Sequence, residues 1–210
     1  MGESTTIAVD LAKSVFEVAV SVQKREQGEE HMPLGLLIAS PQMRDPNFAG
    51  TVVLMCHHDA EGALGVVINR ITSIPVEDVL NDLGLPNDAR PPGERLFWGG
   101  PVEQSTGFLV TRELPIEEDE GWTFPSGLVV TTAPDRLRER LPSSVAYRLC
   151  LGCAGWGPGQ LDEEIRAGGW LFTDLDETLI FERPPEAVYD LAMASLGLVA
   201  SQVWMNPIDE

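Results

Sequence analysis

Residues 35–70, GLLIASPQMRDPNFAGTVVLMCHHDAEGALGVVINR, contain three apolar runs separated by turn residues. The runs cover residues 34–40, 51–57 and 63–69. They are rich in Leu, Ile and Val and are bounded by Gly, Pro, Asn or Asp, which is typical of short β-strands. HHDAEGAL, between the second and third runs, has the length and the turn residues of a hairpin loop. This stretch therefore predicts consecutive β-strands joined by turns.

The remainder of the chain continues this pattern with few helices. Further strands are predicted at 95–98, 107–112, 128–132, 146–152, 170–172 and 178–182. Helices are predicted within 73–85, 132–141, 158–169 and 185–197, each with a Ser, Thr or Pro at its start and most with a Gly at its end. Nine strands and about four helices that do not alternate regularly predict an α+β fold with a largely antiparallel sheet.

The net charge of the chain limits the classes of molecule that it is expected to bind. The 210 residues include 14 Lys and Arg against 33 Asp and Glu, a formal charge of −19. Such a chain repels phosphate backbones and anionic lipid, and its few basic residues form no cluster. Direct nucleic-acid binding and membrane association are therefore not expected. The sequence has no apolar run near the ~20 residues of a membrane span and no signal peptide. Three cysteines, an odd number, predict reduced thiols and a cytoplasmic location.

A change of composition divides the chain. QKREQGEEH (23–31) has no apolar side chain, so residues 1–31 are predicted to be an extension with a polar linker, residues 32–200 the folded domain and 201–210 a tail. TTIAVDLAKSVFEVAVS within the extension resembles the first strand of an RNase H-like domain in one group of insertion-sequence transposases, in which Asp10 would bind a metal ion. That site needs further carboxylates and a basic surface. We interpret the segment as a tethered amphipathic stretch of alternating apolar residues; a vestige, a fusion product and a gene-model artefact are the alternative origins.

FTDLDETLIF (172–181) resembles the opening motif of haloacid-dehalogenase-type phosphatases, in which the first aspartate, here Asp174, attacks phosphorus. Such enzymes place this motif at the end of a central strand of a Rossmann-like sheet and use a later Lys. Only 32 residues follow Thr178, and both lysines, Lys13 and Lys24, precede it. We therefore interpret the motif as a solvated acidic turn between two short strands. A magnesium-dependent phosphatase remains the third hypothesis.

Three blocks resemble the AlgH/YqgE family of bacterial proteins. The first is residues 35–70, quoted above. The second is LFWGGPVEQSTGFLV (96–110), and the third is LCLGCAGWGPGQLDEEIRAGGWL (149–171). With their connections they cover about residues 33–198. The resemblance implies an α+β fold in which a bifurcated sheet curls into a pseudo-barrel with helices packed outside. It also implies a regulatory role, since the family name comes from a proposed role in alginate production, and it implies no enzymatic activity.

The family blocks also contain turns that can present main-chain N–H groups. FWGGPV places two glycines before a proline, and GWGPGQLDEE leads into a helix N-terminus. If the turns converge, they form a pocket for a small anion or a carboxylate-bearing peptide. The predicted binding residues are Cys56, Asn69, Gly99, Gly100, Pro101, Trp156, Gly159 and Gln160. In the alternative reading, the glycines serve turn geometry and the tryptophans, above all Trp98 and Trp170, pack in the core.

The cysteines allow a second functional reading. Cys150 and Cys153 have C-x-x-C spacing, but in a strand such side chains point to opposite faces, so buried thiols are predicted in place of a zinc or redox pair. Cys56 precedes His57 and His58 and matches a family cysteine, and a protonated imidazole beside it would increase its reactivity.

The sequence as a whole predicts a non-enzymatic, cytoplasmic binding protein of the AlgH/YqgE type. It would regulate gene expression or another process through an unidentified protein or small-molecule partner. No catalytic residue, cofactor or metal site is predicted. The alternative is a thiol-based redox sensor centred on Cys56.

Overall fold

The computed structural model describes residues 34–86 and 91–198, which form two compact units. The central unit, named for its place in the sequence, consists of residues 71–86 and 91–153. The flanking unit consists of residues 34–70 and 154–198. The predicted extension, residues 1–31, with Asp10 and the boundary at Met32, lies outside the described residues, as does the tail at 201–210.

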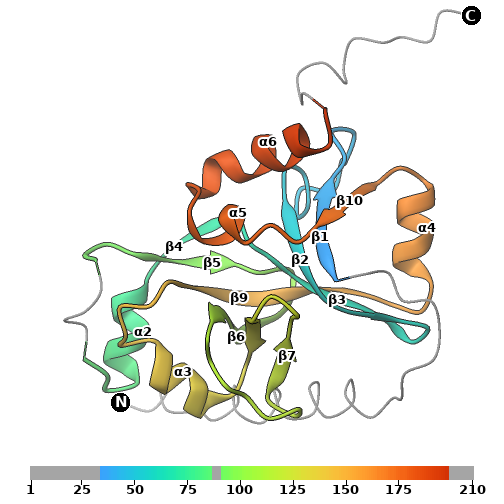
Figure 1. The fold of residues 1–210 in the computed structure, drawn as a ribbon. Helices are drawn as coiled ribbons and strands as arrows, with labels where there is room; N and C mark the ends of the chain where they lie inside the picture. The colour runs from blue at the N-terminus through green and yellow to red at the C-terminus, as the bar shows by residue number, and fades with distance from the viewer. Residues whose placement is uncertain (1–33, 87–90, 199–210) are drawn as a thin grey trace, which may run out of the picture. The chain divides into compact units, whose positions relative to one another are not determined.

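The flanking unit contains an antiparallel sheet with strand order β10-β1-β2-β3-β9 (Figure 1). Its strands are β1 (Gly35–Ala39), β2 (Val52–Asp59), β3 (Gly62–Val67), β10 (Trp170–Asp174) and the end of β9 (Tyr147–Trp156). Its helices are α4 (Gln160–Arg166), α5 (Glu177–Phe181) and α6 (Pro185–Ser195). Every residue of β1 is buried, which matches its uninterrupted apolar sequence, and α6 packs on β1 and β2.

The hairpin predicted from HHDAEGAL is present between β2 and β3. Asp59 and Gly62 face each other across the turn, and the Asp59 carboxylate accepts hydrogen bonds from the N–H groups of Glu61 (2.8 Å) and Gly62 (3.1 Å). The register shifts by one residue between Met55 and His57, which is a β-bulge. The turn chemistry visible in the sequence thus positions the two histidines at the end of β2.

The central unit contains a second sheet with strand order β4-β5-β9-β6-β8-β7, in which β5 runs parallel to β9 and the other pairs are antiparallel. Its strands are β4 (Ile71–Pro75), β5 (Arg95–Trp98), β6 (Val102–Arg112), β7 (Gly121–Thr123), β8 (Leu128–Thr131) and the first part of β9. Its helices are α2 (Val76–Asp82) and α3 (Pro134–Arg140). Its core contains Val76, Leu80, Leu96, Leu109, Leu114, Leu141, Tyr147 and Leu149.

The predicted α+β fold with a largely antiparallel sheet is confirmed, with five helices among the described residues. Strand β9 belongs to both ladders, so the sheet branches there. The end strands β10 and β7 do not pair with each other within the described residues, so the sheet is not closed into a barrel. None of the helices in this part of the chain is long and apolar enough to span a membrane.

The strand predicted at residues 178–182 is wrong, because Glu177–Phe181 form helix α5. Asp176 is the N-cap of this helix. Its Oδ1 accepts hydrogen bonds from the N–H of Thr178 (2.9 Å) and from its Oγ1 (2.7 Å). The first of these bonds satisfies a main-chain donor that would otherwise lack a partner. The helix therefore forms although Thr, Ile and Phe favour strands.

Candidate functional site

The turn that joins β9 to α4 is both exposed and well fixed. We call Gly157, Pro158, Gly159 and Gln160 the β9–α4 turn, and all four residues are exposed. Gly159 has a φ of 69°, a left-handed conformation that glycine adopts without steric cost. Gln160 closes the turn because its Oε1 accepts a hydrogen bond from the N–H of Gly157 (3.1 Å). The turn therefore has one preferred shape.

The carboxylate of Glu164, one helical turn further on, connects the β9–α4 turn to the protein interior. Its Oε1 accepts a hydrogen bond from Nε2 of Gln160 (2.8 Å). Its Oε2 accepts hydrogen bonds from the indole N–H groups of Trp156 (3.0 Å) and Trp170 (2.8 Å). Hydrogen bonds to an ionised acceptor are stronger than neutral ones. We call Gln160, Glu164, Trp156 and Trp170 the Glu164 clamp.

Three aromatic rings support the clamp from within the flanking unit. Phe48 stacks on Trp156 with ring centroids 6.2 Å apart, and its edge meets Trp170 at 5.4 Å. The two indoles meet edge to face at 5.7 Å. Such pairs stabilise by about 0.5–1.5 kcal/mol beyond the area they bury.

The tryptophans do not form the walls of an open pocket. Trp156 is 6 % exposed and Trp170 is 2 % exposed, so both pack in the interior and use their only polar atom on Glu164. This confirms the core reading for Trp170, whereas Trp98 is only half-buried. Two of the predicted binding residues, Gly159 and Gln160, lie in the β9–α4 turn and are exposed.

Asn69, another predicted binding residue, is engaged in a structural contact. Its Oδ1 accepts a hydrogen bond from the N–H of Val52 (2.9 Å), and its Nδ2 donates to the carbonyl oxygen of Gly50 (2.9 Å). The amide thereby ties the end of β3 to the start of β2. Orienting a ligand would require it to give up one of these bonds.

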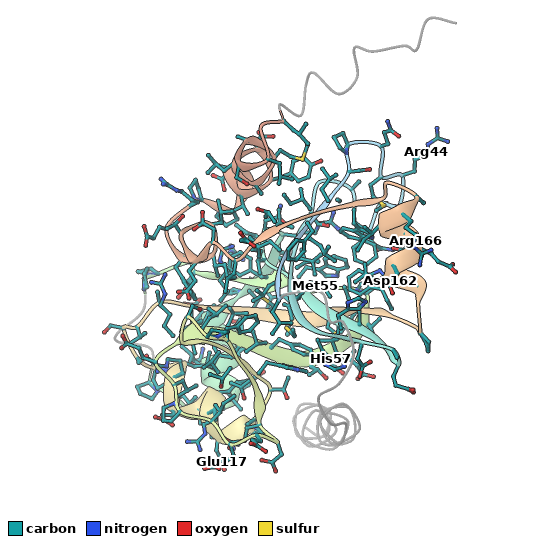
Figure 2. All side chains as sticks on the ribbon, turned by 45° about the vertical axis from the view of Figure 1, so that its right-hand side comes forward. Arg44, Met55, His57, Glu117, Asp162 and Arg166 are labelled. Carbon is teal, nitrogen blue, oxygen red and sulfur yellow. The ribbon has the colours of Figure 1, made fainter. Side chains whose placement is uncertain are left out.

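The adjacent histidines His57 and His58 each face a carboxylate. Nε2 of His57 lies 3.0 Å from Oδ2 of Asp59, and Nε2 of His58 lies 3.3 Å from Oδ1 of Asp162. Figure 2 shows Asp162 and Arg166 on α4 and His57 near the β2–β3 hairpin. The His58 pair joins the hairpin to the first turn of α4, so the imidazoles brace local structure.

The three thiols are buried. The Cys56 side chain is 1 % exposed, with its Sγ 3.8 Å from the carbonyl oxygen of Leu54. Burial raises the pKa of the Cys150 and Cys153 thiols to about 12. A reactive cysteine is accessible and has a lowered pKa. Among the residues described, no three His, Cys, Asp or Glu side chains lie where they could hold a metal ion.

The predicted Gly99–Gly100–Pro101 turn belongs to the central unit, and its glycines are buried. The N–H of Gly99 donates to the carbonyl oxygen of Leu151 (2.7 Å), so it is not free for a ligand. A Cβ on Gly99 would fall on the carbonyl oxygen of Gly152, and one on Gly152 would lie 2.6 Å from that of Gly100. These glycines allow two backbone segments to approach closely.

Asp174 does not occupy the position that phosphatase chemistry requires. It ends β10, which runs antiparallel to β1 with Asp174 opposite Gly35. A Rossmann-like phosphatase presents its aspartate at the carboxyl end of a strand within a parallel sheet. Asp176, which would transfer the proton, caps α5 instead.

Sequence reasoning missed Glu164, Phe48 and Asp162. One signal was available for Glu164, because it follows Gln160 by four residues, the spacing at which helical side chains meet. No local signal identifies Phe48, which contacts the tryptophans from a loop more than a hundred residues away in sequence.

Comparisons with known proteins identify the family of this chain. Residues 36–201 match the family model described as DUF179, AlgH-like. A UPF0301 protein of Burkholderia vietnamiensis is 39% identical over 173 residues, covering 80% of this chain and 89% of the relative. One from Paraburkholderia phymatum is 39% identical over 171 residues, with the same coverage of both chains.

Two solved structures share the fold. The solution structure of the AlgH protein from Pseudomonas aeruginosa has a TM-score of 0.67 and 29% identity, covering 89% of this chain and all of that one. A crystal structure of a protein from Corynebacterium diphtheriae has a TM-score of 0.62 at 24% identity, covering 83% of this chain and 92% of that one, and shows the fold alone. The chain therefore belongs to the AlgH-like family, UPF0301.

Proposed function

We propose that this AlgH-like protein is a non-enzymatic, cytoplasmic binding protein that regulates gene expression or another process by engaging a protein or small-molecule partner at the β9–α4 turn. The observation that carries the proposal is that this turn is fully exposed yet held by the Glu164 clamp. Exposed loops on a rigid scaffold are where proteins concentrate recognition. A partner meeting this turn loses little affinity to ordering it.

The state of the reactive side chains supports binding over chemistry. The thiols are buried, His57 and His58 each face a carboxylate, and Asp176 caps a helix. The partner is not nucleic acid in this proposal, because a formal charge of −19 repels a phosphate backbone.

The test compares two variants of the full chain. Gln160→Ala removes both hydrogen bonds of the Gln160 amide and should loosen the β9–α4 turn. Glu186→Ala, on an exposed position of α6, is the matched control. Partners from a lysate pull-down are identified by mass spectrometry and metabolites by thermal-shift screening. The affinity of each confirmed partner is then measured by titration calorimetry.

We expect Gln160→Ala to weaken binding at least about tenfold while Glu186→Ala leaves it unchanged, because a turn that has lost these two internal hydrogen bonds must be ordered by the partner. Equal affinity of Gln160→Ala and the parent protein would contradict the proposal. So would turnover of a bound substrate that a single side-chain change abolishes.

The redox alternative has a separate test. Cys56 should react with iodoacetamide more slowly than free cysteine at neutral pH, because its side chain is 1 % exposed. A faster reaction would favour a redox sensor over a passive binding protein.

A further inference from the structure

Strand β10 is the end strand of the flanking sheet. Its pairing with β1 shows which of its residues direct their main-chain groups toward β1 and which direct them away. It pairs with β1 in continuous register over five residues. The N–H of Ser40 donates to the carbonyl oxygen of Gly169 (2.9 Å), which makes these two residues a hydrogen-bonded pair. In an antiparallel ladder such pairs alternate. Leu171 and Thr173 therefore direct their N–H and C=O groups toward β1.

The intervening residues, Trp170, Phe172 and Asp174, direct their main-chain groups to the opposite side. Within the described residues, no hydrogen bond involves the main-chain N–H or C=O of Phe172 or Asp174. Phe172 is half-buried and Asp174 is exposed. A row of unpaired donors and acceptors along an end strand is a template for another strand.

One of the two end strands of the central sheet, β4, shows how such an edge is protected. Its register with β5 is interrupted, and it ends in Pro75. The carbonyl oxygen of Ser73 accepts a hydrogen bond from Arg95, and the N–H of Ile74 donates to Oγ1 of Thr72 (3.1 Å). Bulges, proline and occupied main-chain groups all discourage pairing. Strand β10 has a regular register and no proline.

Charge and rigidity indicate which strand the β10 edge would accept. Asp174 lies on the edge, and the exposed Asp176 follows it. The described residues of the flanking unit contain twelve Asp and Glu against four Arg and no Lys, a formal charge of −8. A second copy of this chain would bring the same acidic unit to the edge and be repelled. Trp170, held by Glu164 (2.8 Å), fixes the other end of β10.

We propose that an extended segment of a partner protein, with Lys or Arg at the end beside Asp174, adds to β10 as a further strand. This proposal rests on the proposed function and makes it more specific, because the partner is then a protein. The main-chain groups of Phe172 and Asp174 supply the affinity, as in other strand-addition complexes, and the carboxylates select the basic end.

The first test uses synthetic peptides with the full-length protein. A fluorescein-labelled peptide, Lys-Lys-Val-Thr-Val-Thr-Val, is compared by fluorescence anisotropy with its Glu-Glu counterpart and with a version carrying proline at the central Thr. We expect the basic peptide to bind at least about tenfold more tightly than either other peptide, and its affinity to fall as salt rises. Equal binding of all three peptides would refute the proposal.

A pair of variants separates charge from main-chain pairing. Asp174→Asn removes the carboxylate but keeps the outward N–H, and should weaken the basic peptide about threefold to tenfold. Asp174→Pro removes both and should weaken it further, while the unfolding transition stays near that of the parent because this N–H makes no bond to β1. Thr173→Pro is the contrast, because it breaks the β1 ladder and should destabilise the fold. An Asp174→Pro affinity equal to that of Asp174→Asn would overturn the strand-addition mode.

Amide hydrogen exchange gives a readout that does not depend on substitution. In the free protein, Phe172 and Asp174 should exchange faster than Leu171 and Thr173. The saturating basic peptide should slow the first pair at least about tenfold and change the second pair less. Uniform slowing, or a Phe172 already protected in the free protein, would contradict the proposal.

Failure of this inference is distinguishable from failure of the proposed function. If a confirmed partner still binds Asp174→Pro but is lost with Gln160→Ala, strand addition at β10 is wrong and the function of the β9–α4 turn stands. If neither change affects the partner, both proposals are wrong.

Discussion

Two glycine-rich turns, one in each unit, look alike in sequence and differ in the structure. The β9–α4 turn of the flanking unit is exposed, and a Cβ on its Gly159 would meet nothing within 4 Å. The glycines of the Gly99–Gly100–Pro101 turn of the central unit are buried and lie against Gly152. In the first turn, glycine allows the chain to change direction. In the second turn, glycine allows two backbone segments to approach each other closely. Only the first leaves a surface for a partner.

The strongest test of this comparison is Gly152→Ala. Gly152 has a φ of +77°, and a Cβ there would lie 2.6 Å from the carbonyl oxygen of Gly100 and 2.7 Å from that of Val102. Left-handed strain and overpacking together should lower the free energy of unfolding by about 3 kcal/mol or more. Urea unfolding measures this loss, and a loss below about 1 kcal/mol would show that the close approach is not required.

Glu164→Ala tests the other turn through its support. The change leaves the buried indole N–H groups of Trp156 and Trp170 without their acceptor. We expect about 2–3 kcal/mol of destabilisation, together with a change in tryptophan fluorescence, because unsatisfied buried donors cost about 1–3 kcal/mol each and water relieves part of this. Glu163→Ala, at an exposed neighbouring position, is the control. Equal effects of the two changes would show that Glu164 does not hold the two tryptophans.

Gly159→Ala should have a smaller effect than Gly152→Ala, because only backbone strain is involved. Its φ of 69° predicts a loss of about 1 kcal/mol in the free energy of unfolding. Gly159→Asn should recover part of the loss, since Asn adopts this conformation more readily than other residues. If Gly159→Ala costs as much as Gly152→Ala, the two turns do not differ as described.

The smallest effect is expected on the free energy of unfolding at acid pH. It involves one carboxylate in each unit, Asp59 in the flanking unit and Glu120 in the central unit. Burial of Asp59 opposes its ionisation, but the Glu61 N–H and His57 outweigh this and lower its pKa. The Glu117 N–H, followed by Arg136, lowers the pKa of Glu120 against opposing burial. A carboxylate whose pKa is lower in the folded state than in the unfolded state stabilises the fold at pH values above its unfolded-state pKa of ~4. This stabilisation is lost as the pH falls through the folded-state pKa.

The corresponding variants are Asp59→Asn and Glu120→Gln. Each should cost about 0.5 kcal/mol at pH 7, because the carboxylates are partly solvated, and the difference from the parent should shrink below about pH 4. Chemical denaturation at several pH values checks this. A difference that persists unchanged to pH 2 would assign the stabilisation to something other than ionisation.

The sequence predicted those elements whose local signals agree with their tertiary environment. Residues 35–70 contain apolar runs with turn residues between them, and β1, β2, β3 and the hairpin formed as expected. Helix α5 was missed because the Asp176 cap outweighs the strand preference of the residues after it. Strand β4 was missed because most of its residues are exposed and it ends in a proline.

The candidate site was predictable only in part. Gly159 and Gln160 were identified from a family block, and the structure places both in an exposed turn. The Glu164 clamp depends on Trp156 and Trp170, which lie on different strands and meet only after the sheet forms. Whether a glycine-rich turn is open or buried depends on which backbone segment faces it, and local sequence carries no such information.

Tyrosine gives each unit its own natural spectroscopic reporter. The chain has two tyrosines, Tyr147 in the central unit and Tyr189 in the flanking unit. Tyr189 donates its phenolic hydrogen to the carbonyl oxygen of Ala39 (2.8 Å), and burial raises its pKa. At alkaline pH the phenolate forms more readily in the unfolded chain, so this anchor of α6 to β1 weakens above about pH 10. In single-tyrosine variants, tyrosinate absorbance would therefore report on Tyr147 or on Tyr189 separately.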